Sequence, residues 1–518
     1  MVDSAFAIAL TAHVMLVSKE LGGKILGWLP ALEISRAEGT LLSITLGLGS
    51  FSFLITLAGL IGLLNPVMLM ALLAGLTALF YGGIASTIRS LPHSLRIVPG
   101  SWRRASIWGR LAAVLAILIA GTAGLQALTP EFGYDPLVYH LQAPRLFLQA
   151  GRIYPEAGNW LADLPLSIQM LYTIGLSFSS DTFARLIHLA FGVILVSAVI
   201  LFSKRLLPLT PSWLAGAVVL ATPSLPIWAS HAHADVAWAA LEGLAYFSAI
   251  SWANDRREGW LILSGAFSGF ALATKPLAGM GVAAIGLFLL WHHRRDSAIV
   301  ALRNLAAFAL PAFALCSPWY VKNWLWFGHP LFPISIASNE PAVVERWELT
   351  RSYVLEGLSA GKGPLDLLVL PIRLYLEPTE PTFVDAPSLL LIFIAILPLS
   401  PAAPSRSALA MQAVRYAGFL ATSHQARFLL PITVLASLPI ANSMASGRFR
   451  RARPLLFGIA LLCMVVTLIA SLLRTAQTRP LRVIMGTESK AEFLTRNLEG
   501  FQTLMYISEH VAEEETVY

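Results

Sequence analysis

Apolar stretches of membrane-spanning length alternate with shorter polar segments along most of the 518-residue chain. A spanning helix needs about 20 mostly apolar residues, with a range of about 17–25. Stretches of this kind are 40–63, 66–87, 111–128, 183–203, 213–230, 236–252, 298–316, 428–445 and 454–473. Further candidates are 260–291, which could hold two helices broken near Thr274-Lys275-Pro276, and the shorter or interrupted 5–17, 387–400 and 407–421. The pattern predicts an all-α polytopic membrane protein, a bundle of about 11 to 14 transmembrane helices.

The composition supports a membrane protein and excludes other classes. Hydrophobic residues make up 56% of the chain and charged residues 13%, about half the charged share of an average globular protein. The same values exclude an intrinsically disordered chain. Two cysteines, Cys316 and Cys463, are too few for a disulfide scaffold. Arg415 lies inside a predicted span, where an arginine costs about 2.5–3.5 kcal/mol, so we expect that it faces protein or water or that the helix is tilted.

The net charge of +7 would suggest a nucleic-acid partner in a soluble protein, but here the basic residues punctuate apolar segments. They cluster in alternate loops, at Arg89, Arg96, Arg103, Arg104 and Arg110, at Lys204-Arg205, Arg256-Arg257 and Arg294-Arg295, and at Arg448, Arg450, Arg451 and Arg453. Short loops rich in Lys and Arg face the cytoplasm. This rule predicts that the three larger polar segments, 129–182, 317–386 and 474–518, are external. We expect no nucleic-acid partner and no cleavable signal peptide.

The first external segment carries reactive side chains close to the end of a span. It reads TPEFGYDPLVYHLQAPR over residues 129–145 and places His140 and Arg145 after Asp135, at spacings suited to an amphipathic helix on the membrane surface. A carboxylate beside a His and an Arg could act as a general base toward an acceptor hydroxyl. Alternatively, Asp135 is the N-cap of the helix that Pro136 begins. The two roles are compatible.

A short polar turn, His231-Ala232-His233-Ala234-Asp235, joins two predicted spans. Imidazole and carboxylate groups are the ligand types of a divalent metal site. The spacing is not a specific zinc signature, and a polar connecting turn explains it as well. Asp235 opens a span on the same predicted side of the membrane as Asp135.

Basic residues lie near the external ends of later apolar segments. Lys275, in ALATKPLAG, is a cation in an apolar stretch, which either a lipid phosphate or a snorkelling side chain would explain. Arg427, directly before the span 428–445, could hold a phosphate with two parallel hydrogen bonds. Lys322 and Asn323 lie in PWYVKNW, whose aromatic residues are typical of a membrane interface.

Five segments, in this order, resemble the GT-C superfamily of polytopic glycosyltransferases, and most closely its bacterial branch of protein O-mannosyltransferase-like and aminoarabinose transferase-like enzymes. The segments are GYDPLVYHLQAPRLFLQAGRIYP, HADVAWAALEGLAYF, ATKPLAG, SPWYVKNWLWFGHPLFP and SHQARFLLP. Each is short, but their order and the topology agree with the family over about residues 111–510.

The resemblance implies a GT-C-like bundle with interfacial helices in large external loops, and transfer of a sugar from a polyprenyl-phosphate carrier to an acceptor outside the membrane. Asp135 matches the catalytic acid, Asp235 a second acidic position, and Glu131 is the nearest acidic neighbour in the loop. Lys275 and Arg427 match basic residues that contact the carrier phosphate. Further candidates are Arg145 for the phosphate, and His140, His233, Lys322, Asn323 and Gln425 in the loops. Metal dependence stays open.

The chain also departs from the family pattern. In relatives the catalytic loop usually follows the first span, whereas three hydrophobic segments precede it here. We therefore expect N-terminal accessory helices and a basic cytoplasmic loop in 1–110, a catalytic core in 111–473, and an external tail in 474–518.

The predicted function is therefore a glycosyltransferase of the inner (plasma) membrane that acts on its external face. The acceptor would be a lipid, a glycan or a protein. A lipid-linked sugar flippase or polysaccharide exporter is the main alternative, and a membrane scaffold protein is a third. A flippase or exporter explains less well why polar residues concentrate in external loops. A scaffold protein leaves unexplained why Asp135, Asp235, Lys275 and Arg427 lie on one side. The sugar, the acceptor, the carrier length and the oligomeric state do not follow from the sequence.

Overall fold

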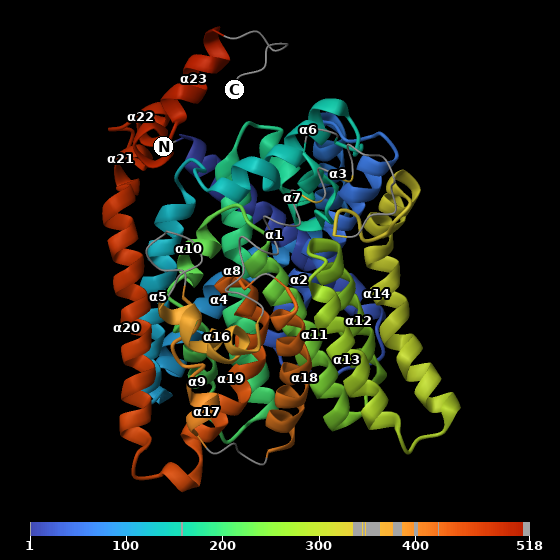
Figure 1. Cartoon of the computed structure of the whole chain (residues 1–518), viewed down its shortest axis with the longest axis vertical. Coiled ribbons are helices and arrows are strands. Elements are labelled where there is room, and N and C mark those ends of the chain that lie inside the picture. The colour runs from blue at the N-terminus through green and yellow to red at the C-terminus, as the bar shows by residue number, and fades with distance from the viewer. Residues whose placement is uncertain are drawn as a thin grey trace.

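The computed structural model describes residues 2–156, 159–334, 344, 348, 363–376, 386–397, 402–422 and 424–510. Within them the chain is a bundle of helices and contains no β-strand (Figure 1). The predicted all-α polytopic membrane protein is confirmed. Much of the predicted external segment 317–386 lies outside the described residues.

The helices keep the chain order in which they were predicted but have different boundaries. They are α1 (Val2–Trp28), α2 (Arg36–Leu60), α3 (Pro66–Leu79), α4 (Tyr81–Arg104), α5 (Ile107–Ala127), η1 (Pro136–His140), α6 (Gln142–Ala150), η2 (Trp160–Asp163), α7 (Ser167–Leu176), α8 (Asp181–Leu206), α9 (Ser212–Leu220), α10 (Leu225–Ser230), α11 (Asp235–Asp255), α12 (Glu258–Thr274), α13 (Ala278–His293), α14 (Ala298–Phe327), α16 (Pro364–Leu376), α17 (Phe393–Ile396), α18 (Ala403–Leu420), η4 (Ala426–Leu429), α19 (Leu430–Ala445), η5 (Gly447–Phe449), α20 (Arg453–Thr478), α21 (Pro480–Ile484), α22 (Lys490–Asn497) and α23 (Phe501–His510).

Among the described residues, seven helices are long and apolar enough to span a membrane, or eight if the bent pair of α3 and α4 is one span. This count is lower than the expected 11 to 14 because several predicted spans are built from shorter helices. The segment 213–230 is split into α9 and α10. Pro223 and Pro226 lie at or next to this break, and they favour it because a proline disfavours helical conformation at the residue before it. The predicted break of 260–291 at Lys275-Pro276 is confirmed.

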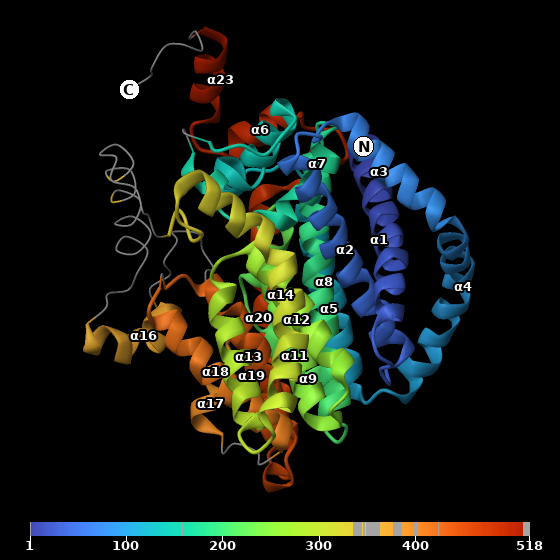
Figure 2. The ribbon, with the colours of Figure 1, turned by 90° about the vertical axis from the view of Figure 1, so that its right-hand side faces the viewer.

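The N-terminal helices pack closely on one another and on the rest of the bundle. A Cβ atom at Gly22 would lie 1.9 Å from the Ser43 carbonyl oxygen, and one at Gly47 would lie 1.7 Å from that of Ser18. Only glycine therefore permits this contact between α1 and α2. Helix α2 in turn packs against α7 and α8, while α4 lies at the outer edge of the bundle (Figure 2).

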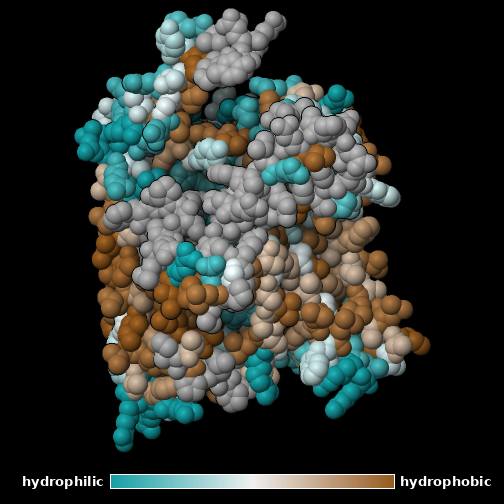
Figure 3. All heavy atoms as spheres, in the orientation of Figure 1, coloured by the Kyte–Doolittle hydropathy of each residue, from teal (hydrophilic) through white to brown (hydrophobic). Residues whose placement is uncertain are grey.

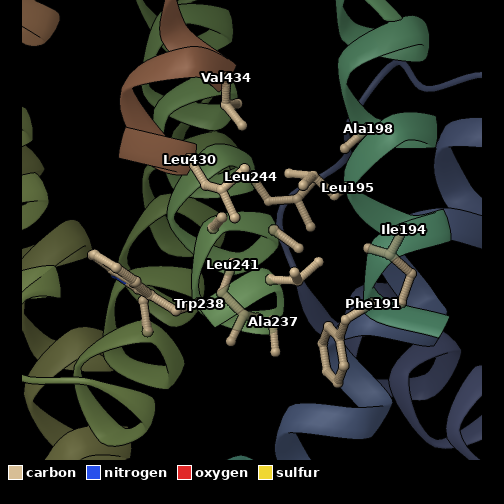
Figure 4. Close-up of a cluster of buried hydrophobic side chains, with 14 of the residues drawn as sticks. Phe191, Ile194, Leu195, Ala198, Ala237, Trp238, Leu241, Leu244, Leu430 and Val434 are labelled. Carbon is tan, nitrogen blue, oxygen red and sulfur yellow. The ribbon is translucent and has the colours of Figure 1, made fainter. Parts of the chain in front are cut away.

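The centre of the bundle is apolar. In Figure 4, Phe191, Ile194, Leu195 and Ala198 of α8 face Ala237, Leu241 and Leu244 of α11, with Leu430 and Val434 of α19 beside them. The outer surface follows the pattern of a membrane protein, because hydrophobic residues cover the middle and hydrophilic residues gather toward both ends (Figure 3). Helix α11 packs against α8, α12, α13, α18 and α19, so it is the central element on which the site described next is built.

Candidate active site

Four charged side chains from distant parts of the sequence meet at one end of α11. The Nη2 atom of Arg427 lies 2.7 Å from Oδ2 of Asp135, and its Nε atom lies 3.9 Å from Oδ2 of Asp235. Asp235 is also paired with the ammonium group of Lys275. The sequence predicted each of these four as a site residue, and the structure brings them together.

Each of the four residues lies where a helix begins or ends. Asp235 is the first residue of α11, Lys275 follows the last residue of α12, and Arg427 lies in η4, directly before α19. Lys275 is extended (φ −154°, ψ 127°), as expected for a residue that precedes a proline. A charged side chain at the end of a helix lies outside the apolar middle of the bundle. Three helix ends therefore contribute side chains to this polar cluster.

Asp135 does not act as a helix cap. It has helical dihedral angles (φ −56°, ψ −44°) and makes no capping hydrogen bond, whereas an N-cap residue is extended and accepts one. The expected single amphipathic helix is also divided: a five-residue π-helix, η1, is followed at Leu141 by α6. Short π-helical turns are frequent at functional sites. The capping interpretation was therefore wrong, and the carboxylate is directed at Arg427 instead.

The two carboxylates of the cluster differ in accessibility. The Asp135 side chain is 23% exposed, whereas that of Asp235 is 1% exposed. Burial by itself would raise the pKa of Asp135, but nearby positive charges, that of Arg427 first among them, together hold the pKa below the ordinary value. Asp135 is thus the more exposed of the two carboxylates of the cluster.

Two buried histidines adjoin Asp135. Ligand atoms of Asp135, His140 and His233 all lie within 4.8 Å of one another. Among the residues that the structure describes, neither Nε2 of His140 nor Nδ1 of His233 has a hydrogen-bond partner. Burial, followed by the charge of Arg427, lowers the pKa of His233 to about 3, and burial likewise holds the pKa of His140 well below its usual value. Neutral imidazoles beside a carboxylate fit a divalent cation.

This candidate metal group differs from the sequence-based one. We expected ligands from His231, His233 and Asp235, but Nδ1 of His231 lies 2.5 Å from Oε1 of Glu131 and is therefore engaged elsewhere. His140 takes its place, and its Nδ1 atom is 2.7 Å from Nε2 of Gln169.

Glu131 forms a separate buried cluster. Its Oε2 atom accepts a hydrogen bond from the Ala232 backbone (2.7 Å) and lies 3.7 Å from Nε of Arg185, while the backbone N–H groups of Phe132 and Gly133 donate to Oε1. Burial would raise the pKa of Glu131, but the charges of His231 and Arg185 and these hydrogen bonds lower it far below the ordinary value. The carboxylate side chain is fully buried. Glu131 thus joins the first loop to the 231–235 turn, and its assignment as a catalytic residue stays a prediction.

Lys322 and Asn323 lie in a third group. The Nζ atom of Lys322 donates to the Asp163 carbonyl oxygen (3.2 Å) and lies 3.9 Å from its Oδ1 atom. The Asn323 amide donates to the carbonyl oxygens of Asp163 (3.1 Å) and Phe332 (2.8 Å). These two residues therefore tie the loop before α7 to the end of α14. Burial raises the pKa of Asp163 to about 7 even though Lys322 lowers it.

The remaining two predicted residues are Arg145 and Gln425. Arg145 is exposed on α6. Gln425 is buried beside Arg427, and its Oε1 atom has no hydrogen-bond partner in the described part of the chain. Both assignments stay predictions.

Sequence reasoning missed residues that hold the site in place. Arg185 donates to the carbonyl oxygens of Thr129, Pro130 and Ser230, which fixes both ends of the Glu131 cluster. The sequence did contain a signal for Arg185, because this residue, like Arg415, is a charged residue within a predicted apolar span. Tyr172, whose hydroxyl donates to the His233 carbonyl oxygen (2.5 Å), carried no such signal.

Residues 163–322 match the family described as Dolichyl-phosphate-mannose-protein mannosyltransferase. No curated protein matches the chain. Two solved structures of ArnT from Cupriavidus metallidurans match it, one bound to undecaprenyl phosphate and one in the apo state. Each is 15% identical, with 79% of this chain and 81% of the other covered, at TM-scores of 0.46 and 0.45.

The family match includes Asp235, Lys275, Lys322 and Asn323, whereas Asp135 and Arg427 lie outside it. Over residues 163–322 it thus confirms the resemblance to the GT-C membrane glycosyltransferases that the sequence segments indicated.

Proposed function

We propose that the protein is a membrane glycosyltransferase that moves a sugar from a polyprenyl-phosphate carrier to an acceptor hydroxyl, with Asp135 as the general base. The observation that carries the proposal is the meeting of one accessible carboxylate, Asp135, with the cations of Arg427 and Lys275 around the buried Asp235. The family match over residues 163–322 supports this class of enzyme.

The arrangement suits a direct displacement at the anomeric carbon. Asp135 takes the proton of the acceptor hydroxyl, whose oxygen forms a bond to the anomeric carbon from the side opposite the phosphate. The bond from this carbon to the phosphate oxygen breaks, and its electron pair leaves with the phosphate. The configuration of the sugar is inverted. Arg427 and Lys275 stabilise the negative charge that develops on the departing phosphate.

The proposed mechanism gives a different part to each carboxylate. Asp235 is buried, is paired with Lys275 and lies 3.9 Å from Arg427, so it orients the two cations. Asp135 has Arg427 as its direct partner at 2.7 Å. A donor phosphate that binds Arg427 would compete for this guanidinium and leave the Asp135 carboxylate free to accept a proton.

The proposed reaction takes place on the external face of the inner membrane. Asp235 is the first residue of α11, and Arg256-Arg257 follow its last residue. This 21-residue helix is about 30 Å long, the thickness of the apolar core of a bilayer. The basic loop therefore marks the cytoplasmic end of α11, and the cluster lies at the other end.

A transfer assay tests the proposal. Purified protein in detergent or nanodiscs is incubated with polyprenyl-phosphate donors that carry radiolabelled sugars, together with lipid, glycan and protein fractions of a bacterial cell envelope. We expect label in one acceptor fraction. Parallel reactions with EDTA, and with added Zn²⁺ or Mn²⁺, test whether a metal is needed.

The same labelled donors distinguish a glycosyltransferase from a lipid-linked sugar flippase. Such a protein would move the labelled donor across a vesicle membrane without releasing free polyprenyl phosphate. Transbilayer movement without transfer would contradict the proposed function.

A further inference from the structure

A second charged pair lies deeper in the bundle, on the same helix as Asp235. Glu242, two turns farther along α11, accepts a hydrogen bond from Nε of Arg415 on α18 (2.9 Å). The two side chains are 3% and 1% exposed. The expectation that Arg415 faces protein is thereby confirmed. Glu242 also accepts hydrogen bonds from Nε1 of Trp238 (2.5 Å) and from the Tyr246 hydroxyl.

The neighbouring helix α13 closes tightly over this pair. A Cβ atom at Gly281 would lie 2.5 Å from the carboxylate carbon of Glu242, and one at Gly418 on α18 would lie 2.5 Å from Sδ of Met280. Met280 in turn lies with its Sδ atom 3.5 Å from Nη1 of Arg415. Glycine at both positions allows α11, α13 and α18 to enclose the charges. The Glu242–Arg415 pair is therefore enclosed by close packing of these three helices.

A buried ion pair contributes little net stability, because the cost of removing two charges from water offsets their attraction. An apolar pair of similar volume would hold these helices together equally well. The contacts of Trp238 indicate what the charges do instead.

The indole ring of Trp238 lies between the deep pair and the candidate active site. Its ring centre is 5.2 Å from Cζ of Arg415 and 5.4 Å from Nζ of Lys275. The Lys275 ammonium also lies 4.2 Å from the ring centre of Phe428, the residue after Arg427. In Figure 4, Trp238 is on the opposite side of α11 from Phe191 of α8. Two aromatic rings and the Asp235 carboxylate therefore bound the Lys275 ammonium.

We propose that Trp238, held by the Glu242–Arg415 pair, is a positioning residue that fixes the Lys275 ammonium for the carrier phosphate. This inference rests on the proposed function, in which Lys275 binds that phosphate. The hydrogen bond from Nε1 to Glu242 sets the orientation of the indole. The ring face then limits where the ammonium of Lys275 can lie. Glu242 and Arg415 act on the site through Trp238 and do not touch the substrate.

The test is a double-mutant cycle on the full-length protein with undecaprenyl phosphate as the probe. Its dissociation constant is measured in nanodiscs for the unmodified protein, Trp238→Phe, Lys275→Ala and the double variant. Trp238→Phe keeps an aromatic ring but removes the N–H donor. We expect about 3- to 30-fold weaker binding when Lys275 is present, and no further weakening in the Lys275→Ala background.

A second variant tests the deep pair itself. Glu242→Gln combined with Arg415→Met removes both charges without leaving one of them unpaired, and we expect the same dependence on Lys275. Trp252→Phe is the matched control, since Trp252 is a buried tryptophan near the other end of α11, against His293. The dissociation constant of undecaprenyl phosphate for Trp252→Phe should equal that for the unmodified protein.

The possible outcomes separate the two proposals. If Trp238→Phe weakens binding by the same factor with and without Lys275, or has no effect with Lys275 present, the positioning role is wrong while the proposed function stands. If the unmodified protein does not bind undecaprenyl phosphate at all, the proposed function is wrong and the inference falls with it.

Discussion

Glu131 and Asp135 lie four residues apart in one loop, yet the fold places them in different environments. Glu131 is fully buried, and backbone N–H groups, His231 and Arg185 surround its oxygens. Asp135 keeps 23% of its side chain exposed and has Arg427 as its direct partner. A carboxylate whose lone pairs are all occupied holds a structure together, whereas one with free lone pairs can accept a substrate proton. Under the proposed function, accessibility and the number of donors separate the structural acid Glu131 from the base Asp135.

The largest expected effect is on the accessible carboxylate. Asp135→Asn removes the proton acceptor but keeps the size of the side chain, so we expect kcat/KM for sugar transfer to fall about 10²- to 10⁴-fold. Thermal stability should change little, because the side chain is partly exposed. Asp255→Asn is the control, since Asp255 bonds Trp260 at the other end of α11. Full transfer activity in Asp135→Asn would contradict its role as the base.

Removal of the guanidinium that joins the two aspartates should have the next largest effect on activity. Arg427→Gln leaves Asp135 without its partner and takes one cation from the proposed phosphate site, so we expect about a 10²- to 10³-fold lower kcat/KM. Arg152→Gln changes an exposed arginine of the 129–182 segment, which also contains Asp135, and should leave kcat/KM within about twofold. Equal losses in both variants would mean that general surface charge, and not this cluster, governs the reaction.

Glu131 should show the reverse pattern. Glu131→Gln leaves Arg185 buried without its counter-charge, and breaking a buried pair costs about 3–5 kcal/mol. We expect a lower yield and a lower unfolding temperature in detergent, with kcat per folded molecule reduced less than tenfold. A stable Glu131→Gln protein without activity would instead place Glu131 in the chemistry and abolish the contrast with Asp135.

Asp163 offers a smaller test of the same comparison. It is buried like Glu131, but its Oδ1 atom has no hydrogen-bond partner in the described residues, and burial raises its pKa to about 7 from 3.8. The folded state therefore binds the proton more tightly than the unfolded chain does, so stability is lost as the pH rises through this interval. We expect about 1–3 kcal/mol lower stability at pH 8 than at pH 5. In Asp163→Asn the pH dependence should be smaller, and an unchanged slope would assign it to other groups.

Much of the fold followed from the hydrophobic pattern because each apolar stretch must form a helix to satisfy its backbone in the membrane. The break at Lys275-Pro276 was predictable for the same reason that it occurs, the proline. The split of 213–230 was not predicted, although Pro223 and Pro226 mark it in the sequence. The bend of 70° between α3 and α4 was not predicted either, because it depends on packing that the hydrophobic pattern does not contain.

The site was predictable as a set of residues but not as a geometry. Asp135, Asp235, Lys275 and Arg427 were singled out as charges at the ends of apolar segments. The sequence could not show that Glu131 is directed toward His231 and Arg185, because these pairings join residues about 50 to 100 positions apart. Trp238 and Glu242 also escaped notice, since their importance comes from neighbours on other helices.

The contact between Asp135 and Arg427 joins residues 292 positions apart in the chain, and this sets a time at which the protein can first become active. At about 5–20 residues per second, Arg427 is synthesised roughly 15–60 s after Asp135. During that interval the earlier helices can already be inserted, but the cluster lacks its bridging cation. A nascent or prematurely terminated chain would thus be integrated without the complete cluster, so under the proposed function an incomplete copy would not consume carrier-linked sugar.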